Sequence, residues 1–230
     1  MRYKGVEHIF FDLDHTLWDF DLNSKLAYNQ IFKEQKLDLE LDRFIKIYEP
    51  LNLEFWRKYR NNEISKEELR YQRLKTAFDA CEYYVDDDKI DLFANLYIEY
   101  LPNNNHLFEG CHELLNNLKS RYKLHCITNG FKEVQKLKMD QSNLTQYFDI
   151  ILTAEEAKVK KPDPKIFHMA LERAGATAQN SLMVGDSHEA DILGAQNLGM
   201  RTIYLKIDKP AQFETGRVQK LSEIQSLLSL

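Results

Sequence analysis

The stretch HIFFDLDHTLWDF, residues 8–20, places two carboxylates directly after an apolar run. The segment HIFF is typical of a short buried strand, because Ile and Phe pack well on the faces of a sheet. Asp12 and Asp14 follow at once. A buried strand that ends in paired negative charge needs a reason, since charge buried without a partner is unfavourable. The rest of the chain must therefore supply partners for these two aspartates.

Other short apolar runs follow, each ending in polar residues or glycine: KLHCIT (123–128), FDIILT (148–153), SLMVG (181–185) and RTIYL (201–205). Segments with helical patterns alternate with them, over residues 108–122, 132–141, 164–175 and 187–199. Short apolar runs with such flanks indicate strands buried on both faces of a sheet. Strand–helix alternation predicts an α/β fold with a Rossmann-like, open parallel sheet.

A long helical region interrupts this alternation between residues 20 and 104. Ser65 and Glu68 form a capping-box pattern within it, which predicts the start of a helix. The alternative is that these helices belong to the main domain, but a single crossover does not need so many residues. We therefore expect a helical cap over residues 20–104, inserted after the first strand. The α/β core would then comprise residues 1–19 and 105–230.

Composition limits the classes of function. Of the 230 residues, 43% are hydrophobic and 29% are charged, as in globular proteins, and the formal net charge of −5 disfavours binding to polymeric nucleic acid. The three cysteines form no CxxC pair, which favours a reducing compartment. The sequence shows no signal-peptide pattern and no membrane-spanning apolar stretch, so we expect a cytoplasmic location and no membrane partner.

Several of the expected strands end in residues that suit catalysis. Thr128 ends the run 123–128 and Asn129 follows it. Asp186 follows the run 181–185, with Asp191 five residues further on. The carboxyl ends of parallel strands lie at one rim of the sheet, where ligands bind in folds of this class. We expect these residues to meet Asp12 and Asp14 there.

The residue types at this rim suit phosphoryl transfer. Clustered carboxylates repel each other unless a cation intervenes, and oxygen ligands without a His or Cys cluster suit Mg²⁺. A threonine hydroxyl and free amides at a helix start suit phosphate oxygens. A lysine would suit an anionic substrate, and Lys158, Lys160 and Lys161 follow the third expected strand. Together these groups predict metal-assisted phosphoryl transfer.

Four short motifs now stand in order: DLDHT (12–16), TN (128–129), KP (161–162) and GDSHEAD (185–191). In type and order they resemble the four motifs of the haloacid dehalogenase-like phosphatases. The helical region 20–104 lies where that family carries its cap.

The resemblance implies roles for the matching residues. Asp12 would be the nucleophile that forms an aspartyl-phosphate, and Asp14 the general acid and base. Thr128 and the amide of Asn129 would hold the phosphoryl group. Lys161, which directly precedes a proline as in the family pattern, would offset negative charge, although Lys158 or Lys160 could replace it.

The resemblance also implies a Mg²⁺ site, formed by Asp12, the backbone carbonyl of Asp14, Asp186 and Asp191. Asp14 favours ester hydrolysis over dehalogenation, because an alkoxide leaving group needs a proton and a halide does not. Trp18, just after the turn, would form a wall of the substrate pocket.

The stretches DHTLWDFD (14–21), NNEISKEELR (61–70) and ITNGF (127–131) resemble the pyrimidine 5′-nucleotidase-like branch of that family. This implies hydrolysis of small phosphate esters, nucleoside 5′-monophosphates in particular, by a monomer or homodimer. The alternatives are a phosphatase for phosphoglycolate or sugar phosphates, a mutase, a 2-haloacid dehalogenase and a catalytically silent phosphate-binding protein. Within the cap, aromatic residues such as Phe55 are expected in the core, and Arg73 is expected in solvent.

Overall fold

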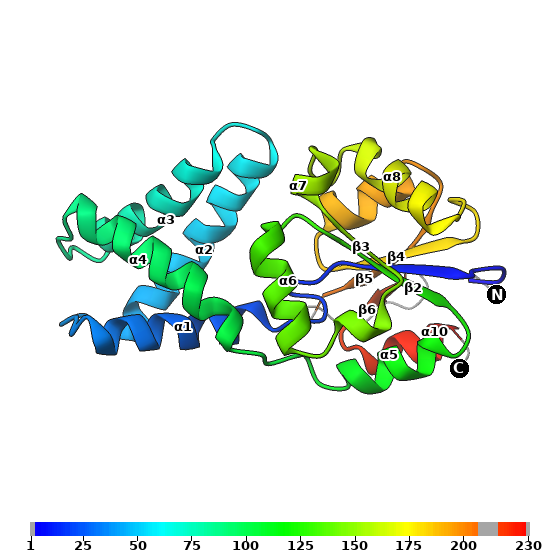
Figure 1. Cartoon of the computed structure of the whole chain (residues 1–230), viewed down its shortest axis with the longest axis horizontal. Coiled ribbons are helices and arrows are strands. Elements are labelled where there is room, and N and C mark those ends of the chain that lie inside the picture. The colour runs from blue at the N-terminus through cyan, green and yellow to red at the C-terminus, as the bar shows by residue number, and fades with distance from the viewer. Residues whose placement is uncertain (1–2, 207–215, 229–230) are drawn as a thin grey trace. The chain divides into compact units, whose positions relative to one another are not determined.

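A computed structural model describes residues 3–206 and 216–228 of the chain. Within these residues a six-stranded sheet has the order β3-β2-β1-β4-β5-β6, and every neighbouring pair is parallel (Figure 1). This confirms the expected α/β class with an open parallel sheet. The strands are β1 (His8–Phe11), β2 (Lys123–Thr128), β3 (Ile150–Thr153), β4 (Ser181–Gly185), β5 (Arg201–Leu205) and β6 (Arg217–Val218).

Helices connect the strands of the core. One of the expected helical segments, 187–199, is interrupted, because residues 188–193 form a π-helical turn before a short α-helix. Residues 154–157 form a short helix that lies outside the expected segments. The core helices are α5 (Cys111–Lys119), α6 (Lys132–Gln141), α7 (Ala154–Ala157), α8 (Pro164–Ala174), α9 (Gly194–Gln196) and α10 (Ser222–Leu228), with a 3₁₀ turn at Thr145–Tyr147 and the π turn η3 at His188–Leu193.

The sheet is covered on both faces. α8 packs on one face, where Ile166 and Phe167 join Phe10, Ile127 and Met183 in a buried cluster. α5 and α10 cover the other face (Figure 1). Strands buried on both sides need apolar residues at successive positions, which explains the continuous runs in the sequence.

Residues 20–104 form a second compact unit, distinct from residues 1–19 and 105–230. The capping box is present at the start of its third helix: Ser65 Oγ accepts from Glu68 N, and Ser65 N donates to Glu68 Oε2. The helices of this unit are α1 (Phe20–Glu34), α2 (Leu41–Arg60), α3 (Lys66–Ala80) and α4 (Asp87–Tyr100), followed by a 3₁₀ turn at Leu101–Asn103.

The interior of the helical unit is aromatic and holds one buried cation. Tyr28 stacks on Tyr97 at 4.5 Å between ring centroids. The side chain of Arg73 lies over the Tyr97 ring and donates to Asn52 Oδ1 at 2.9 Å. The expectation that Arg73 is solvated was wrong, because this residue is only 1% exposed. Phe55 is buried as expected.

Within the described part of the chain, no helix is long and apolar enough to cross a membrane.

Candidate active site

The turn after β1 sets the position of the first two aspartates. β1 lies between β2 and β4, and Asp12 N continues the pairing by donating to Val184 O at 2.9 Å. The chain then reverses, because the Leu13 carbonyl accepts from the backbone amides of residues 16, 17 and 18. His15 adopts a left-handed conformation, with φ of 59°, inside this turn. Asp12 therefore stays at the end of the strand, while Asp14 lies on the turn.

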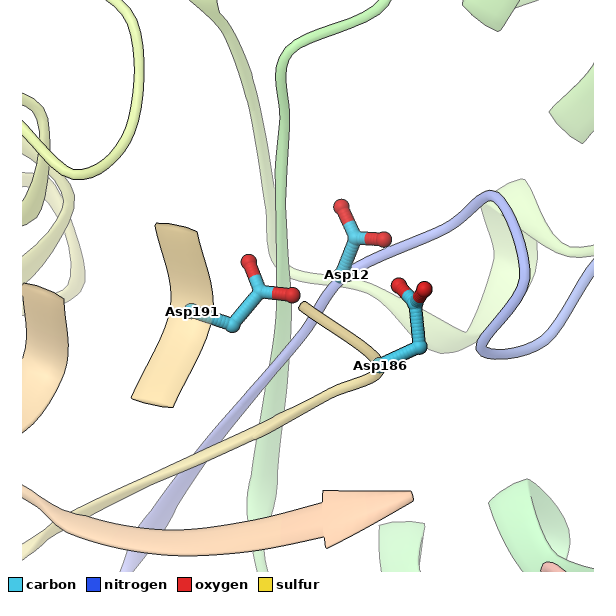
Figure 2. A group of neighbouring side chains, drawn as sticks. All are labelled: Asp12, Asp186 and Asp191. Atoms are coloured by element: carbon cyan, nitrogen blue, oxygen red, sulfur yellow. The ribbon is translucent and has the colours of Figure 1, made fainter. Parts of the chain in front are cut away.

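Three carboxylates meet at the carboxyl end of the central strands. Asp12, Asp186 and Asp191 each offer an oxygen, and these oxygens lie within 4.8 Å of one another. Figure 2 shows the three side chains converging from three separate segments of the chain. Oxygen donors alone, at this spacing, fit a hard divalent cation such as Mg²⁺.

Lys161 lies within this acidic group. Its Nζ is 2.6 Å from Asp12 Oδ1 and 2.7 Å from Asp191 Oδ1, and it also donates to the Ile127 carbonyl at 2.7 Å. Lys161 is only 1% exposed, whereas Lys158 lies on the surface and Lys160 is partly buried. Of the three lysines in this segment, Lys161 is the one whose ammonium group contacts Asp12.

Burial and repulsion between carboxylates raise the pKa of Asp12 and of Asp186. Burial, together with the charges of Asp191 and Asp186, raises the pKa of Asp12 to about 8 against the opposing effect of Lys161. Burial and the charge of Asp191 raise the pKa of Asp186 to about 7. Burial alone would lower the pKa of Lys161, but Asp12 and Asp191 raise it overall. One ammonium group therefore does not balance three carboxylates, and a further cation would stabilise their charged forms.

Gly185 makes room for Asp191. A Cβ at position 185 would lie 2.3 Å from Asp191 Oδ2, so a larger residue would displace this carboxylate. The same oxygen is held in place by Ser187 N, which donates to Asp191 Oδ2 at 3.1 Å. The glycine of the GDSHEAD motif is thus required by a side-chain contact, with its backbone outside the left-handed region.

Thr128 and Asn129 reach the site from the end of β2. Gly130 N donates to Thr128 Oγ1 at 3.1 Å. The Asn129 side chain clamps the backbone of Lys161, donating to its carbonyl at 3.0 Å and accepting from its amide at 2.8 Å. Asn129, which directly follows β2 and is remote from Lys161 in sequence, therefore positions Lys161. Its predicted amide contact with a phosphoryl group stays a prediction.

Asp14 has partners that the sequence did not reveal. Lys138 Nζ lies 2.7 Å from Asp14 Oδ1, and Gln135 Nε2 donates to Asp14 Oδ2 at 2.9 Å. Both residues are buried on α6. They stand three positions apart, which places them on one helical face, but nothing in the sequence showed that this face meets the turn after β1. The Asp14 side chain is thus bound to α6 and lies outside the cluster of three carboxylates.

Trp18 has an internal position. It is fully buried, and the Lys138 ammonium lies 4.1 Å from its ring centroid. The ring thus supports the lysine that holds Asp14. The expected contact between Trp18 and substrate stays a prediction.

Known proteins resemble this chain in sequence and in fold. The family model of haloacid dehalogenase-like hydrolases matches residues 9–205. The pyrimidine 5′-nucleotidase YjjG of Escherichia coli is 34% identical over 229 residues, which cover 96% of each chain. The pyrimidine 5′-nucleotidase PynA of Streptococcus pneumoniae is 33% identical over 206 residues, covering 89% of this chain and 84% of PynA. The magnesium-bound crystal structure of the putative hydrolase YfnB from Bacillus subtilis superimposes with a TM-score of 0.87, at 26% identity and full coverage of both chains.

The chain belongs to the haloacid dehalogenase-like hydrolases and is an enzyme of that class. Its resemblance to pyrimidine 5′-nucleotidases extends over most of its length.

Proposed function

We propose that this protein is a Mg²⁺-dependent phosphomonoester hydrolase that acts through an aspartyl-phosphate on Asp12. One observation carries the proposal: the Asp12 carboxylate lies beside Lys161 and within the cluster formed with Asp186 and Asp191. Asp14, two residues further on, is available for proton transfer. A nucleophile, a balancing lysine and a second carboxylate are the groups that this chemistry requires.

The chain's own residues account for each bond change. A carboxylate oxygen of Asp12 attacks phosphorus, and the P–O bond to the alcohol breaks as Asp14 gives its proton to the leaving oxygen. Asp14 then takes a proton from water, which attacks the phosphorus of the aspartyl-phosphate and releases inorganic phosphate and the Asp12 carboxylate. Lys161 offsets negative charge between the nucleophile and the phosphoryl group, and Thr128 with the amide of Asn129 binds phosphoryl oxygens.

The cluster of oxygen donors fits the cation that the mechanism needs. Asp12, Asp186 and the backbone carbonyl of Asp14 would hold Mg²⁺, with Asp191 supporting it and contacting Lys161. When bound, the ion supplies positive charge that neutralises the phosphoryl oxygens.

Nucleoside 5′-monophosphates are the proposed substrates. The support is the similarity to two pyrimidine 5′-nucleotidases, at 33% and 34% identity over most of the chain. We further propose that the enzyme acts as a monomer or homodimer in the cytoplasm, where the three buried free cysteines would stay reduced. Its partners would be small phosphate esters only, without membranes or polymeric nucleic acid.

A substrate panel tests this proposal. Hydrolysis of nucleoside 5′-monophosphates, sugar phosphates and phosphoglycolate is compared by kcat/KM, with Mg²⁺ present and after chelation. We expect the pyrimidine nucleotides to rank first and chelation to abolish turnover. A sugar phosphate or phosphoglycolate at the head of the ranking would overturn the nucleotide assignment, and halide release from a 2-haloacid would overturn the phosphatase.

Two variants test the roles of the aspartates. Asp12→Asn removes the nucleophile and should lower kcat by at least ~10⁴-fold without loss of fold. Asp14→Asn should lower kcat/KM for alkyl phosphates far more than for p-nitrophenyl phosphate, whose leaving group needs no proton. Asp88→Asn, an exposed change in the helical unit, serves as the matched control. Near-native turnover by Asp12→Asn would show that the nucleophile is misassigned.

A further inference from the structure

We infer that Gln135 and Lys138 of α6 are positioning residues that set the place of Asp14 for proton transfer. The inference rests on the proposed phosphatase activity and adds two residues to its machinery. Neither residue lies in the four short motifs. Both contact Asp14 because α6 packs beside the turn that follows β1.

Lys138 is a buried lysine on an otherwise amphipathic helix. Its side chain is only 2% exposed, while Lys136 on the same helix is 73% exposed. An ammonium group leaves water at a large cost unless it gains a strong partner. Here the partners are the Asp14 carboxylate at 2.7 Å and the face of the Trp18 ring at 4.1 Å from its centroid. These contacts fix Lys138 from two sides and direct its ammonium group at one oxygen of Asp14.

Gln135 fixes the other oxygen of Asp14 and ties it to the phosphoryl subsite. Its Nε2 donates to Asp14 Oδ2 at 2.9 Å and to Thr128 Oγ1 at 2.7 Å. One amide group thus spans the proposed acid and the proposed phosphoryl-binding hydroxyl. A Cβ at Gly130 would lie 2.4 Å from Gln135 Cδ, so the glycine of TNG leaves the space that this side chain fills.

The two contacts hold the Asp14 carboxylate in one orientation, which a general acid and base requires. Proton transfer requires Asp14 within hydrogen-bond reach of the ester oxygen while the phosphorus is held elsewhere. Lys138 and Gln135 occupy one lone pair on each carboxylate oxygen, and each oxygen keeps another for a proton. Because the buried Gln135 amide also donates to Thr128 Oγ1, the same group helps to set the distance between Asp14 and the proposed phosphoryl subsite. Loss of either residue would let Asp14 rotate away from the leaving oxygen.

The test compares esters with different leaving groups. We measure kcat/KM of Lys138→Met and Gln135→Met with a nucleoside 5′-monophosphate and with p-nitrophenyl phosphate. Both methionine variants keep much of the side-chain volume and remove the hydrogen bonds. We expect kcat/KM for the nucleotide to fall by ~10–100-fold, since general acid catalysis contributes about 10²–10⁴-fold, while p-nitrophenyl phosphate loses less than about threefold. Lys136→Met, on the exposed face of α6, is the matched control and should leave both rates unchanged.

Each outcome decides the inference. Equal losses on both esters would show that the two residues only stabilise the fold, and unchanged rates would show that Asp14 needs no support; either result overturns the inference. Thermal unfolding of each variant separates lost fold from lost position, and Gln135→Met remains decisive if Lys138→Met does not fold. If wild-type protein hydrolyses neither ester, the proposed function fails. If Asp14→Asn shows the leaving-group effect and both α6 variants do not, only this inference fails.

Discussion

Buried ionisable groups lie at both ends of β1 and β2, but they are neutral at the amino ends of the strands and form an ion pair at the carboxyl ends. Toward the amino ends, His8 and His125 stack with ring centroids 5.3 Å apart, and a hydrogen bond of 3.0 Å joins their ring nitrogens. At the carboxyl ends, Asp12 and Lys161 form an ion pair at 2.6 Å. All four residues are less than 10% exposed, so burial alone does not distinguish the two ends.

The difference lies in how charge is handled. Burial lowers the pKa of His8 and lowers that of His125 to about 4, so both imidazoles are neutral near pH 7 and need no counter-ion. At the other end, three carboxylates face one ammonium group. With all groups ionised, that end lacks two positive charges, which is the charge of one divalent ion. The amino ends of the strands therefore need no further charge, while the proposed Mg²⁺ would balance the carboxylates at the carboxyl ends.

Replacement of Lys161 should have the largest effect on the acidic cluster at the carboxyl ends of the strands. Lys161→Met deletes the partner of Asp12 and Asp191, and we expect the free energy of unfolding without metal to fall by about 3 kcal/mol, with turnover lost. Added Mg²⁺ should restore part of that stability, because it replaces missing positive charge. Denaturant unfolding with and without Mg²⁺ measures both effects, with Lys160→Met as the control. Equal stability of the two variants would contradict the account of Lys161 as the balancing charge.

The buried histidines toward the amino ends of β1 and β2 should make the stability of the fold depend on pH. The folded pKa of His125, about 4, lies below the ordinary value of 6.5, so between these values the unfolded chain binds more protons than the folded one. This histidine's contribution to stability is therefore lost as the pH falls from about 6.5, and the loss approaches about 3 kcal/mol near pH 4.

His125→Phe isolates this effect. The ring should pack against Phe10 as His125 does, at 4.6 Å between centroids in the native protein. The raised pKa values of Asp12 and Asp186 act in the opposite direction but are common to both proteins. Denaturant unfolding between pH 7 and 4 should therefore show that wild type loses more stability than the variant. Parallel curves would mean that the buried imidazole does not titrate as proposed.

A smaller change tests whether the carboxyl end is shaped for a metal. Gly185→Ala brings a Cβ to within 2.3 Å of Asp191 Oδ2 and should displace that carboxylate. Changes to groups that support metal ligands typically cost 10–100-fold in affinity, so we expect a loss in this range. Calorimetric titration with Mg²⁺ measures the affinity, and circular dichroism checks the fold. Unchanged affinity would remove Asp191 from the metal site.

The fold class could be predicted from the sequence, because parallel strands that are buried on both faces appear there as continuous apolar runs. The runs at 123–128, 181–185 and 201–205 coincide with β2, β4 and β5. β6 could not be predicted, because its two residues are too short to form a pattern. The π-helical turn at His188–Leu193 was also not predicted, since the spacing of its apolar residues is that of an ordinary α-helix.

Only part of the candidate site could be predicted from the sequence. Acidic residues at strand ends indicated where Asp12 and Asp186 would meet, because the sheet itself brings strand ends together. Lys138 and Arg73 were not recognised, because a long cation on a helix is normally solvated and only tertiary packing shows that these two are buried. The sequence pattern therefore identified the catalytic candidates at the strand ends. The contribution of α6, which supports Asp14, became visible only in the structure.

The most direct test of the account is to trap the proposed covalent intermediate. Protein turning over a nucleoside 5′-monophosphate is quenched in acid and reduced with borohydride, which converts an aspartyl-phosphate to homoserine. Mass spectrometry of the peptide that contains residues 8–20 then locates the modified position. The account predicts homoserine at position 12, absent from the Asp12→Asn variant. Homoserine at position 14 or 186, or none in an enzyme that turns over, would contradict it.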